Sequence, residues 1–336
     1  MSSAATPTLR IMSWAGGWGR ALRVAVSDPF ERATGVRVEH VSQVGLKLPP
    51  TLLRALETRQ SPDVHVIWCN SVPALHAQQR GHCVPLEGGH ELDELRQRAW
   101  PQCCDERAVV HPYVVYYVLA YHEAACPRGA PRSWNELFEP QHHGKIALYP
   151  GGNGFYPIAQ MLGGGQLSDI PGDMAACWSY LRELRPHIGE LDYSIGMEER
   201  LRRRDLNLCF RALTNALAFR ATGLPVAWCI PHEGTTDTVD ALWVPRGLPA
   251  AVQELARRYV LFALRRNVQT HWCHELGAMP VHSQAEIPVV LRERTDLPKH
   301  ADDHRGILHI AESLKVQHQL DWEARFEQLF RVRQPA

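Results

Sequence analysis

The chain has 336 residues, of which 45% are hydrophobic and 21% charged, and its formal net charge is +0. This composition is typical of a soluble globular protein long enough for two domains, and it predicts no general electrostatic attraction to nucleic acid or to an anionic membrane. No apolar run reaches the length of about 18 residues that a membrane span requires, so none is expected.

The first hundred residues alternate strand and helix patterns. The order β-α-β-α-β-α predicts a mostly parallel sheet with helices on its faces. Gly35 is expected to end the first helix, and Gly81 the third. The predicted strands are 9–14, 36–42 and 63–69, and the predicted helices are 19–35, 47–60 (helical after Pro50) and 72–81.

From residue 108 the pattern changes, and a second α/β unit is predicted. Residues 108–122 are rich in β-formers but too long for one simple strand. Helices are expected over 133–144, capped by Ser133, and over 173–186, 251–267 and 304–333. The remaining elements are a strand and glycine loop over 145–155, a strand-to-helix passage over 206–223 and a strand over 225–234.

Aromatic and small polar residues follow the predicted strands in both halves. Ligands of open parallel sheets bind beyond the carboxyl ends of the strands, so these positions predict a ligand site with aromatic walls. Trp14 and Trp18 flank Gly16 and Gly17, where glycines let a backbone approach a ligand and indoles give it a flat wall. The sequence GGNG at 151–154 lacks the spacing of a dinucleotide site, and no cofactor is predicted.

The order of motifs over residues 9–290 resembles the spermidine/putrescine-type periplasmic solute-binding proteins of ABC transporters. The most specific stretches are DPFERATGV and SWNELFEPQHHGKIAL. The resemblance implies a two-lobe type 2 periplasmic-binding-protein fold of class α/β, monomeric, with mostly parallel sheets and strands that cross between the lobes. Lobe 1 would contain 9–117 and 238–295, and lobe 2 would contain 118–237 and 296–333.

The resemblance also implies a small solute in an interlobe cleft and an ABC permease as partner if the protein is exported. Asp240, after the PHEG turn, matches the acidic residue that polyamine binders use, and a carboxylate in an aromatic box is a sound cation site. Arg211 would repel a dication, so an amine-containing solute whose carboxylate meets Arg211 fits better than a polyamine. The predicted ligand contacts are Trp14, Trp18, Trp68, Asn70, Tyr116, Asn153, Phe155, Arg211, Asn215, Glu233 and Asp240.

The cellular location stays open at this stage. The N-terminus MSSAATPTLRIMSW lacks the basic and apolar regions of a secretory signal. Nine irregularly spaced cysteines favour a reducing compartment, and the neighbours Cys103 and Cys104 are expected to be independent thiols. The protein is therefore cytoplasmic as the sequence stands, or periplasmic if a leader was removed.

Two other classes of function compete with solute uptake. A cytosolic enzyme of thiaminase type on the same fold would use a cleft cysteine, with Cys69 and Cys209 as candidate nucleophiles and His111 or His232 as the activating base. A cytosolic ligand sensor is a variant of this alternative. Metal binding is not predicted, because the pairs His142/His143, His271/His274 and His300/His304 lack further ligands at recognisable spacing.

Overall fold

The computed structural model describes residues 7–43, 47–86, 92–93, 108–192, 196–299 and 306–331. The chain divides into two compact units. Unit 1 contains Met1–Val114, Val239–Glu293 and Lys299–Asp302, and unit 2 contains Val115–Thr238, Arg294–Pro298 and Asp303–Ala336. The chain passes from one unit to the other within β5 (Tyr113–His122) and within β10 (Asp237–Trp243). The sequence analysis placed these two changes after residues 117 and 237.

The sheet of unit 1 brings the ends of its first strands to one edge. Strand β1 (Thr8–Trp14) is parallel to both β2 (Arg37–Gln43) and β3 (Val66–Asn70). Strand β10 is antiparallel to β3, and it also pairs with the short β4 (Val109–Val110). The β11 segment (Met279–Pro280) pairs with the start of β5. Because β1 and β3 are parallel, Trp14 and Asn70 lie at the same edge, as the predicted β-α-β order requires.

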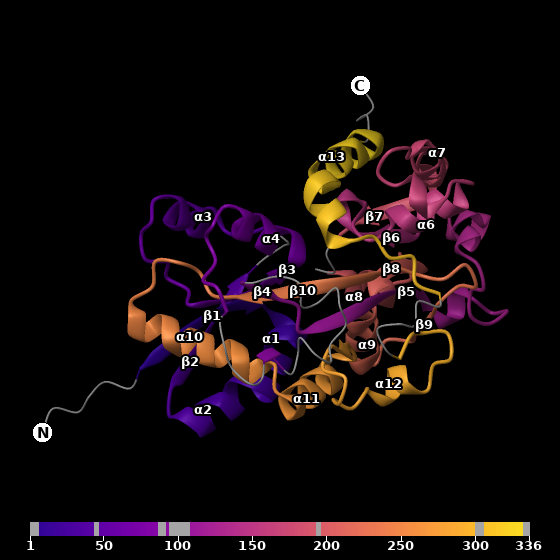
Figure 1. Ribbon diagram of the computed structural model, residues 1–336. Coiled ribbons are helices and arrows are strands. Elements are labelled where there is room, and N and C mark those ends of the chain that lie inside the picture. The colour runs from indigo at the N-terminus through magenta and orange to yellow at the C-terminus, as the bar shows by residue number, and fades with distance from the viewer. Residues whose placement is uncertain are drawn as a thin grey trace, which may run out of the picture. The chain divides into compact units, whose positions relative to one another are not determined.

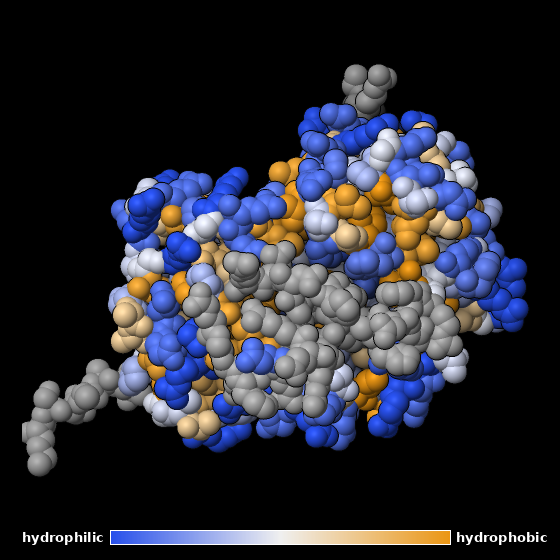
Figure 2. Space-filling model, in the orientation of Figure 1, coloured by the Kyte–Doolittle hydropathy of each residue, from blue (hydrophilic) through white to orange (hydrophobic). Residues whose placement is uncertain are grey.

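Helices cover both faces of this sheet (Figure 1), as the alternating pattern predicted. On one face lie α3 (Pro50–Glu57) and α4 (Ser71–Gln79), and Figure 2 shows mostly hydrophilic residues on the outside of α3. On the other face lie the remaining long helices, whose bounds are α2 (Asp28–Thr34), α10 (Ala250–Ala263) and α11 (Arg266–Leu276). The short α12 (Val289–Arg292) follows β11.

The helix predicted over 19–35 is longer and less regular than expected. It consists of α1 (Gly16–Leu22), a π-helical turn at Arg23–Ser27 and α2, and it ends at Gly35 as predicted. In the π-turn the fully buried Ser27 places its hydroxyl 2.8 Å from Nε2 of His40 and 2.9 Å from the hydroxyl of Tyr259. The turn thus joins β2 to α10 through a buried hydrogen-bond chain.

The hydrogen bonds among Ser27, His40 and Tyr259 predict a loss of stability in mild acid. Burial, followed by the charge of Arg23, lowers the pKa of His40 from 6.5 to about 4. The unfolded chain therefore binds the His40 proton more readily than the folded one, and the contribution of His40 is complete above pH 6.5 and falls as the pH drops toward 4. Urea unfolding across this range should show the decline, and His40→Gln should remove that part of it. An equally steep decline in the variant would contradict the assignment.

The sheet of unit 2 is also mixed. Strand β6 (Ile146–Leu148) is parallel to β7 (Ile188–Leu191) and to β8 (Leu208–Ala212). Strand β5 is antiparallel to β8 and to β9 (Val226–Cys229). The sheets were predicted to be mostly parallel, but in the described residues antiparallel pairs are at least as frequent as parallel ones. The antiparallel pairs all involve β5 or β10, the strands in which the chain changes unit. The β-rich run 108–122 is two strands, because Pro112 has no N–H to donate and separates β4 from β5.

The helices of unit 2 differ from the prediction at two places. Residues 133–144 form two short 3₁₀ turns, Trp134–Phe138 and Pro140–His142, in place of one helix, because Pro140 breaks the hydrogen-bond ladder. The predicted cap at Ser133 is present. The C-terminal helix begins only at Glu312. The helix bounds are α6 (Tyr156–Leu162), α7 (Ala175–Leu184), α8 (Met197–Arg202), α9 (Leu213–Ala221) and α13 (Glu312–Phe330).

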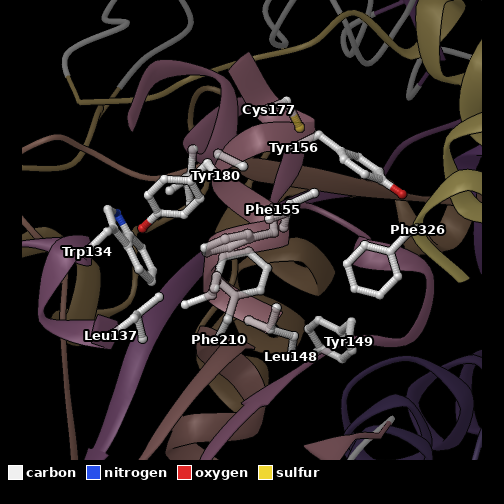
Figure 3. Packing of buried hydrophobic residues seen from close by; sticks show 14 of the residues in the cluster. Trp134, Leu137, Leu148, Tyr149, Phe155, Tyr156, Cys177, Tyr180, Phe210 and Phe326 are labelled. Atoms are coloured by element: carbon white, nitrogen blue, oxygen red, sulfur yellow. The ribbon is translucent and has the colours of Figure 1, made fainter. Parts of the chain in front are cut away.

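The core of unit 2 is aromatic, and helix α13 completes it (Figure 3). Phe155 lies between Trp134 and Phe210, with ring centroids 5.8 and 5.1 Å away. Phe326 of α13 lies so near Gly152 that a Cβ there would be 2.6 Å from its ring. The glycines at 151 and 152, which the sequence analysis associated with a ligand, therefore let the chain approach α13.

Candidate functional site

Unit 1 gathers five aromatic side chains at the edge where β1 and β3 end. We call Trp14, Trp18, Trp68, Tyr113 and Trp272 the aromatic cluster. Trp18 contacts three other members of the cluster. The centroid of its ring lies 4.7 Å from that of Trp14, 5.3 Å from that of Tyr113 and 4.9 Å from that of Trp272. Trp68 stacks on Tyr113 at 6.4 Å and contacts Trp272 at 5.4 Å. The two tryptophans around Gly16 and Gly17 thus belong to one cluster, and both are half-buried.

Asp240 lies beside this cluster and is held by two neutral donors. The Tyr113 hydroxyl donates to Oδ2 over 2.6 Å, and Asn70 Nδ2 donates to Oδ1 over 3.0 Å. The carboxylate is 6% exposed. Burial, the Asp240 charge and the hydrogen bond to Asp240 raise the pKa of Tyr113 well above 10, so its hydroxyl stays protonated and remains a donor. These two donors are uncharged groups, and they fix the orientation of the carboxylate.

Sequence analysis predicted five of these residues as ligand contacts and missed Tyr113 and Trp272. Tyr113 follows Pro112 in a β-rich run, and Trp272 lies on the inner face of an amphipathic helix. Both positions are typical of core residues, and nothing in the spacing connects either one to Trp14. The contact of Trp272 with Trp18 depends on the packing of α11 against α1. These two helices are more than two hundred residues apart in the chain.

In unit 2 uncharged hydrogen-bonding groups follow β6 and β8. Tyr149 follows β6, and its hydroxyl donates to Asn215 Oδ1 over 2.9 Å while accepting from the backbone N–H of Ala212. Asn153 Nδ2 donates to the Tyr117 hydroxyl over 3.4 Å. Asn153 and Asn215 are half-buried. Since β6 and β8 are parallel, the two asparagines follow strands that end at one edge of this sheet.

Arg211 is engaged inside unit 2. Its side chain is fully buried, Nη1 donates to the carbonyl of Phe210 over 2.7 Å and Nη2 donates to the carbonyl of Asp192 over 3.0 Å. The guanidinium also lies 4.6 Å from the centroid of the Tyr149 ring. This geometry favours a structural role for Arg211, because the sites it would offer to a solute carboxylate are used by the backbone.

Three other predicted contacts are buried or have partners within unit 2. Phe155 and Tyr116 are each 1% exposed and belong to buried layers. Glu233 accepts from the Ser133 hydroxyl and, over 3.2 Å, from the backbone N–H of Trp134, so it caps the 3₁₀ turn that begins there. A sequence pattern cannot separate these roles from ligand contact, because both place aromatic or acidic residues after strands.

The cysteine candidates for catalysis are buried thiols. Cys69 faces the side of the sheet opposite to Trp68 and Asn70, where the indole N–H of Trp243 lies 3.4 Å from its sulfur. Burial raises the pKa of Cys69 to about 12 and that of Cys209 to about 11, so neither is a thiolate at neutral pH. His111 Nδ1 bonds the carbonyl of Asp240, and the exposed His232 bonds the carbonyl of Arg132. The geometry disfavours a cysteine nucleophile.

These thiols should resist alkylation in the folded protein. Iodoacetamide at neutral pH should leave Cys69 and Cys209 unmodified, because reaction needs an accessible thiolate. Peptide mapping after labelling, with a sample labelled in guanidinium as the control, checks this. Rapid native labelling of either residue would restore the enzyme alternative.

The described residues contain no group of three or more His, Cys, Asp and Glu side chains arranged to hold a metal. His142 is buried and lies within hydrogen-bond distance of Asn207 and Gln141. The seven cysteines in the described part of the chain are free. Cys103, Cys104, His300 and His304 lie outside the described residues. In the same part of the chain, no helix is both long and apolar enough to cross a membrane.

Solved structures of binding proteins share the fold. The binding protein AgtB from A. tumefaciens R10, in complex with agropinic acid, is 16% identical with a TM-score of 0.78, covering 98% of this chain and 100% of that one. A GABA receptor is 16% identical with a TM-score of 0.79, covering 98% and 99%. AfuA from Actinobacillus pleuropneumoniae, with bound fructose-6-phosphate, is 15% identical with a TM-score of 0.72, covering 98% and 100%. At such identities the likeness shows the fold alone, and it confirms the predicted periplasmic-binding-protein class.

A comparison with curated proteins finds no match. The family model described as bacterial extracellular solute-binding protein matches residues 25–289. That match covers most of the chain and parts of both units. It does not establish the polyamine-specific type that the motifs predicted. The family description concerns proteins outside the cytoplasm, and the cytoplasmic alternative gains no support from it. The chain belongs to the bacterial extracellular solute-binding protein family.

Proposed function

We propose that the protein is the solute-binding component of an ABC uptake system and that its solute carries a protonated amine. The observation that carries the proposal is the buried Asp240 carboxylate, fixed by Tyr113 and Asn70 beside the aromatic cluster. A carboxylate attracts an ammonium group by charge and hydrogen bonding, and aromatic faces add cation–π attraction. The named binding proteins of the same fold take solutes as different as agropinic acid, GABA and fructose-6-phosphate, so the choice of solute depends on the local site.

The amine would meet Asp240, and the rest of the solute would meet uncharged groups. In unit 2 the side chains proposed for this role are Asn153 and Asn215, which are half-buried amides. Arg211 is left out because its guanidinium is engaged with backbone carbonyls. A small amine with hydroxyl or amide groups therefore fits the described residues better than a polyamine, which needs a carboxylate at each end. We also propose that one solute contacts both units and that the protein has an ABC permease as its partner.

A thermal-shift panel tests the proposal. Each amine is paired with an isostere that lacks the charge, such as 1,4-diaminobutane with butane-1,4-diol and 4-aminobutanoate with butanoate. A ligand at one hundred times its Kd stabilises the folded state by about 2.7 kcal/mol, which moves the melting temperature by several degrees. Amines should raise the melting temperature and their isosteres should not. Equal shifts within every pair, or shifts only from the members without an ammonium group, would rule out the amine.

A further inference from the structure

The aromatic cluster contains a buried donor that no described residue satisfies. Trp272 of α11 is 1% exposed, and its ring contacts Trp18, Trp68 and Tyr113. Its indole Nε1–H has no hydrogen-bond acceptor among the described residues. Buried polar groups nearly always have a partner, because leaving water without one costs free energy. Of the other fully buried indoles of unit 1, Trp243 donates to the sulfur of Cys69, and the Nε1–H of Trp68 has no acceptor among the described residues.

A buried acceptor belongs to Asn70, which bonds the same carboxylate as Tyr113. The carboxylate of Asp240 can only accept, so the amide of Asn70 must turn its NH₂ toward Asp240, and its Oδ1 turns away. That oxygen is buried and has no donor among the described residues. Tyr113 joins the two positions, because its hydroxyl bonds Asp240 and its ring centroid lies 5.9 Å from that of Trp272. Trp272 therefore offers a free donor in the aromatic cluster, and Asn70, which bonds Asp240, offers a free acceptor.

The unpaired donor of Trp272 and the unpaired acceptor of Asn70 indicate which chemical group of the solute could bind both. An ammonium group only donates, and a carboxylate only accepts, so each would satisfy one of the two atoms. A hydroxyl group accepts and donates through one oxygen. We propose that a hydroxyl group of the solute accepts from Trp272 Nε1 and donates to Asn70 Oδ1, which makes the solute an amino alcohol. This inference rests on the proposed function, because it places the hydroxyl beside the amine bound by Asp240.

Pairs of amines that differ by one hydroxyl group separate the effect of the hydroxyl on binding from that of the amine. The pairs are 1,4-diaminobutane with 1,4-diamino-2-butanol, 4-aminobutanoate with 4-amino-3-hydroxybutanoate, and ethylamine with 2-aminoethanol. Calorimetric Kd values are measured on the wild type and on Trp272→Phe, which removes the N–H but keeps an aromatic ring. Trp243→Phe is the control, since it removes an indole N–H that has its own partner.

The hydroxylated member of at least one pair should bind the wild type about tenfold more tightly, the effect expected when a buried polar group gains its partner. Trp272→Phe should reduce this preference to less than about threefold, and Trp243→Phe should preserve it. If Trp272→Phe fails to fold, Asn70→Ala serves instead, because it removes the acceptor and should abolish the same preference while also weakening the amine.

The outcomes distinguish the two proposals. If amines bind but hydroxylated and parent compounds bind equally, or if the preference survives in both Trp272→Phe and Asn70→Ala, the hydroxyl assignment is wrong and the amine site stands. If no amine binds, the proposed function itself fails and the hydroxyl assignment falls with it.

Discussion

Asp240→Asn should reduce the affinity for an amine solute by about 100-fold or more, while the protein remains folded. The variant keeps the shape of the side chain but removes the negative charge that pairs with the ammonium group. A hydrogen bond between charged partners contributes about 1.5 to 3 kcal/mol, and a 100-fold loss corresponds to about 2.7 kcal/mol. Titration calorimetry with the amine that gives the largest thermal shift measures the change.

Asp237→Asn is the matched control. Asp237 lies on the same strand, is also 6% exposed and pairs with His309 Nδ1 at 2.8 Å in unit 2. Its replacement removes a buried charge of the same kind without touching the aromatic cluster, so it should lower stability and leave the amine affinity within a few-fold. An Asp240→Asn protein that binds the amine as the wild type does would exclude this carboxylate from the site.

Gly152→Ala should destabilise the protein by about 3 kcal/mol. Gly152 has φ +67, which costs a residue with a side chain about 1 kcal/mol or more, and the new methyl group would lie 2.6 Å from the ring of Phe326. Relieving that clash means moving α13 or repacking an aromatic core, at about a further 1 to 3 kcal/mol. Urea unfolding followed by circular dichroism measures the loss.

Gly164→Ala separates the cost of the positive φ from the cost of the clash with Phe326. Gly164 also has a positive φ, +89, but a Cβ there would meet no atom within 4 Å. This variant should therefore cost about 1 kcal/mol, from backbone strain alone. Equal losses in the two variants would mean that the contact with α13 contributes nothing, and that the glycines at 151 and 152 have another purpose.

The alternation of strands and helices in the first hundred residues could be predicted from the sequence, because hydrophobic periodicity reports directly on which face is buried. Strands β7 and β10 were not predicted. Positions at strand ends were also predictable, and Trp14, Trp18, Trp68, Asn70 and Asp240 lie together in unit 1 for this reason. The helix expected over 133–144 is interrupted at Pro140, because proline has no N–H to donate. The cap at Ser133 therefore begins only a short turn.

The functions of single residues at strand ends were less predictable. Glu233 after β9 and Arg211 near the end of β8 are predicted ligand contacts because they are charged. In the structure Glu233 bonds Ser133, and Arg211 bonds backbone carbonyls of unit 2. Whether a charged group serves the fold or a ligand depends on donors and acceptors brought near it by distant parts of the chain. Tyr113 and Trp272 were missed for the converse reason, since a core aromatic and a site aromatic have the same spacing.

Native mass spectrometry of the purified protein, with and without added amines, tests the central claim most directly. We expect a non-covalent complex with a small amine, either retained from the cell or formed on addition, that dissociates intact on unfolding and is absent from Asp240→Asn. A bound molecule without an amine, a covalent adduct on Cys69 or Cys209, or no complex with any amine would contradict the account.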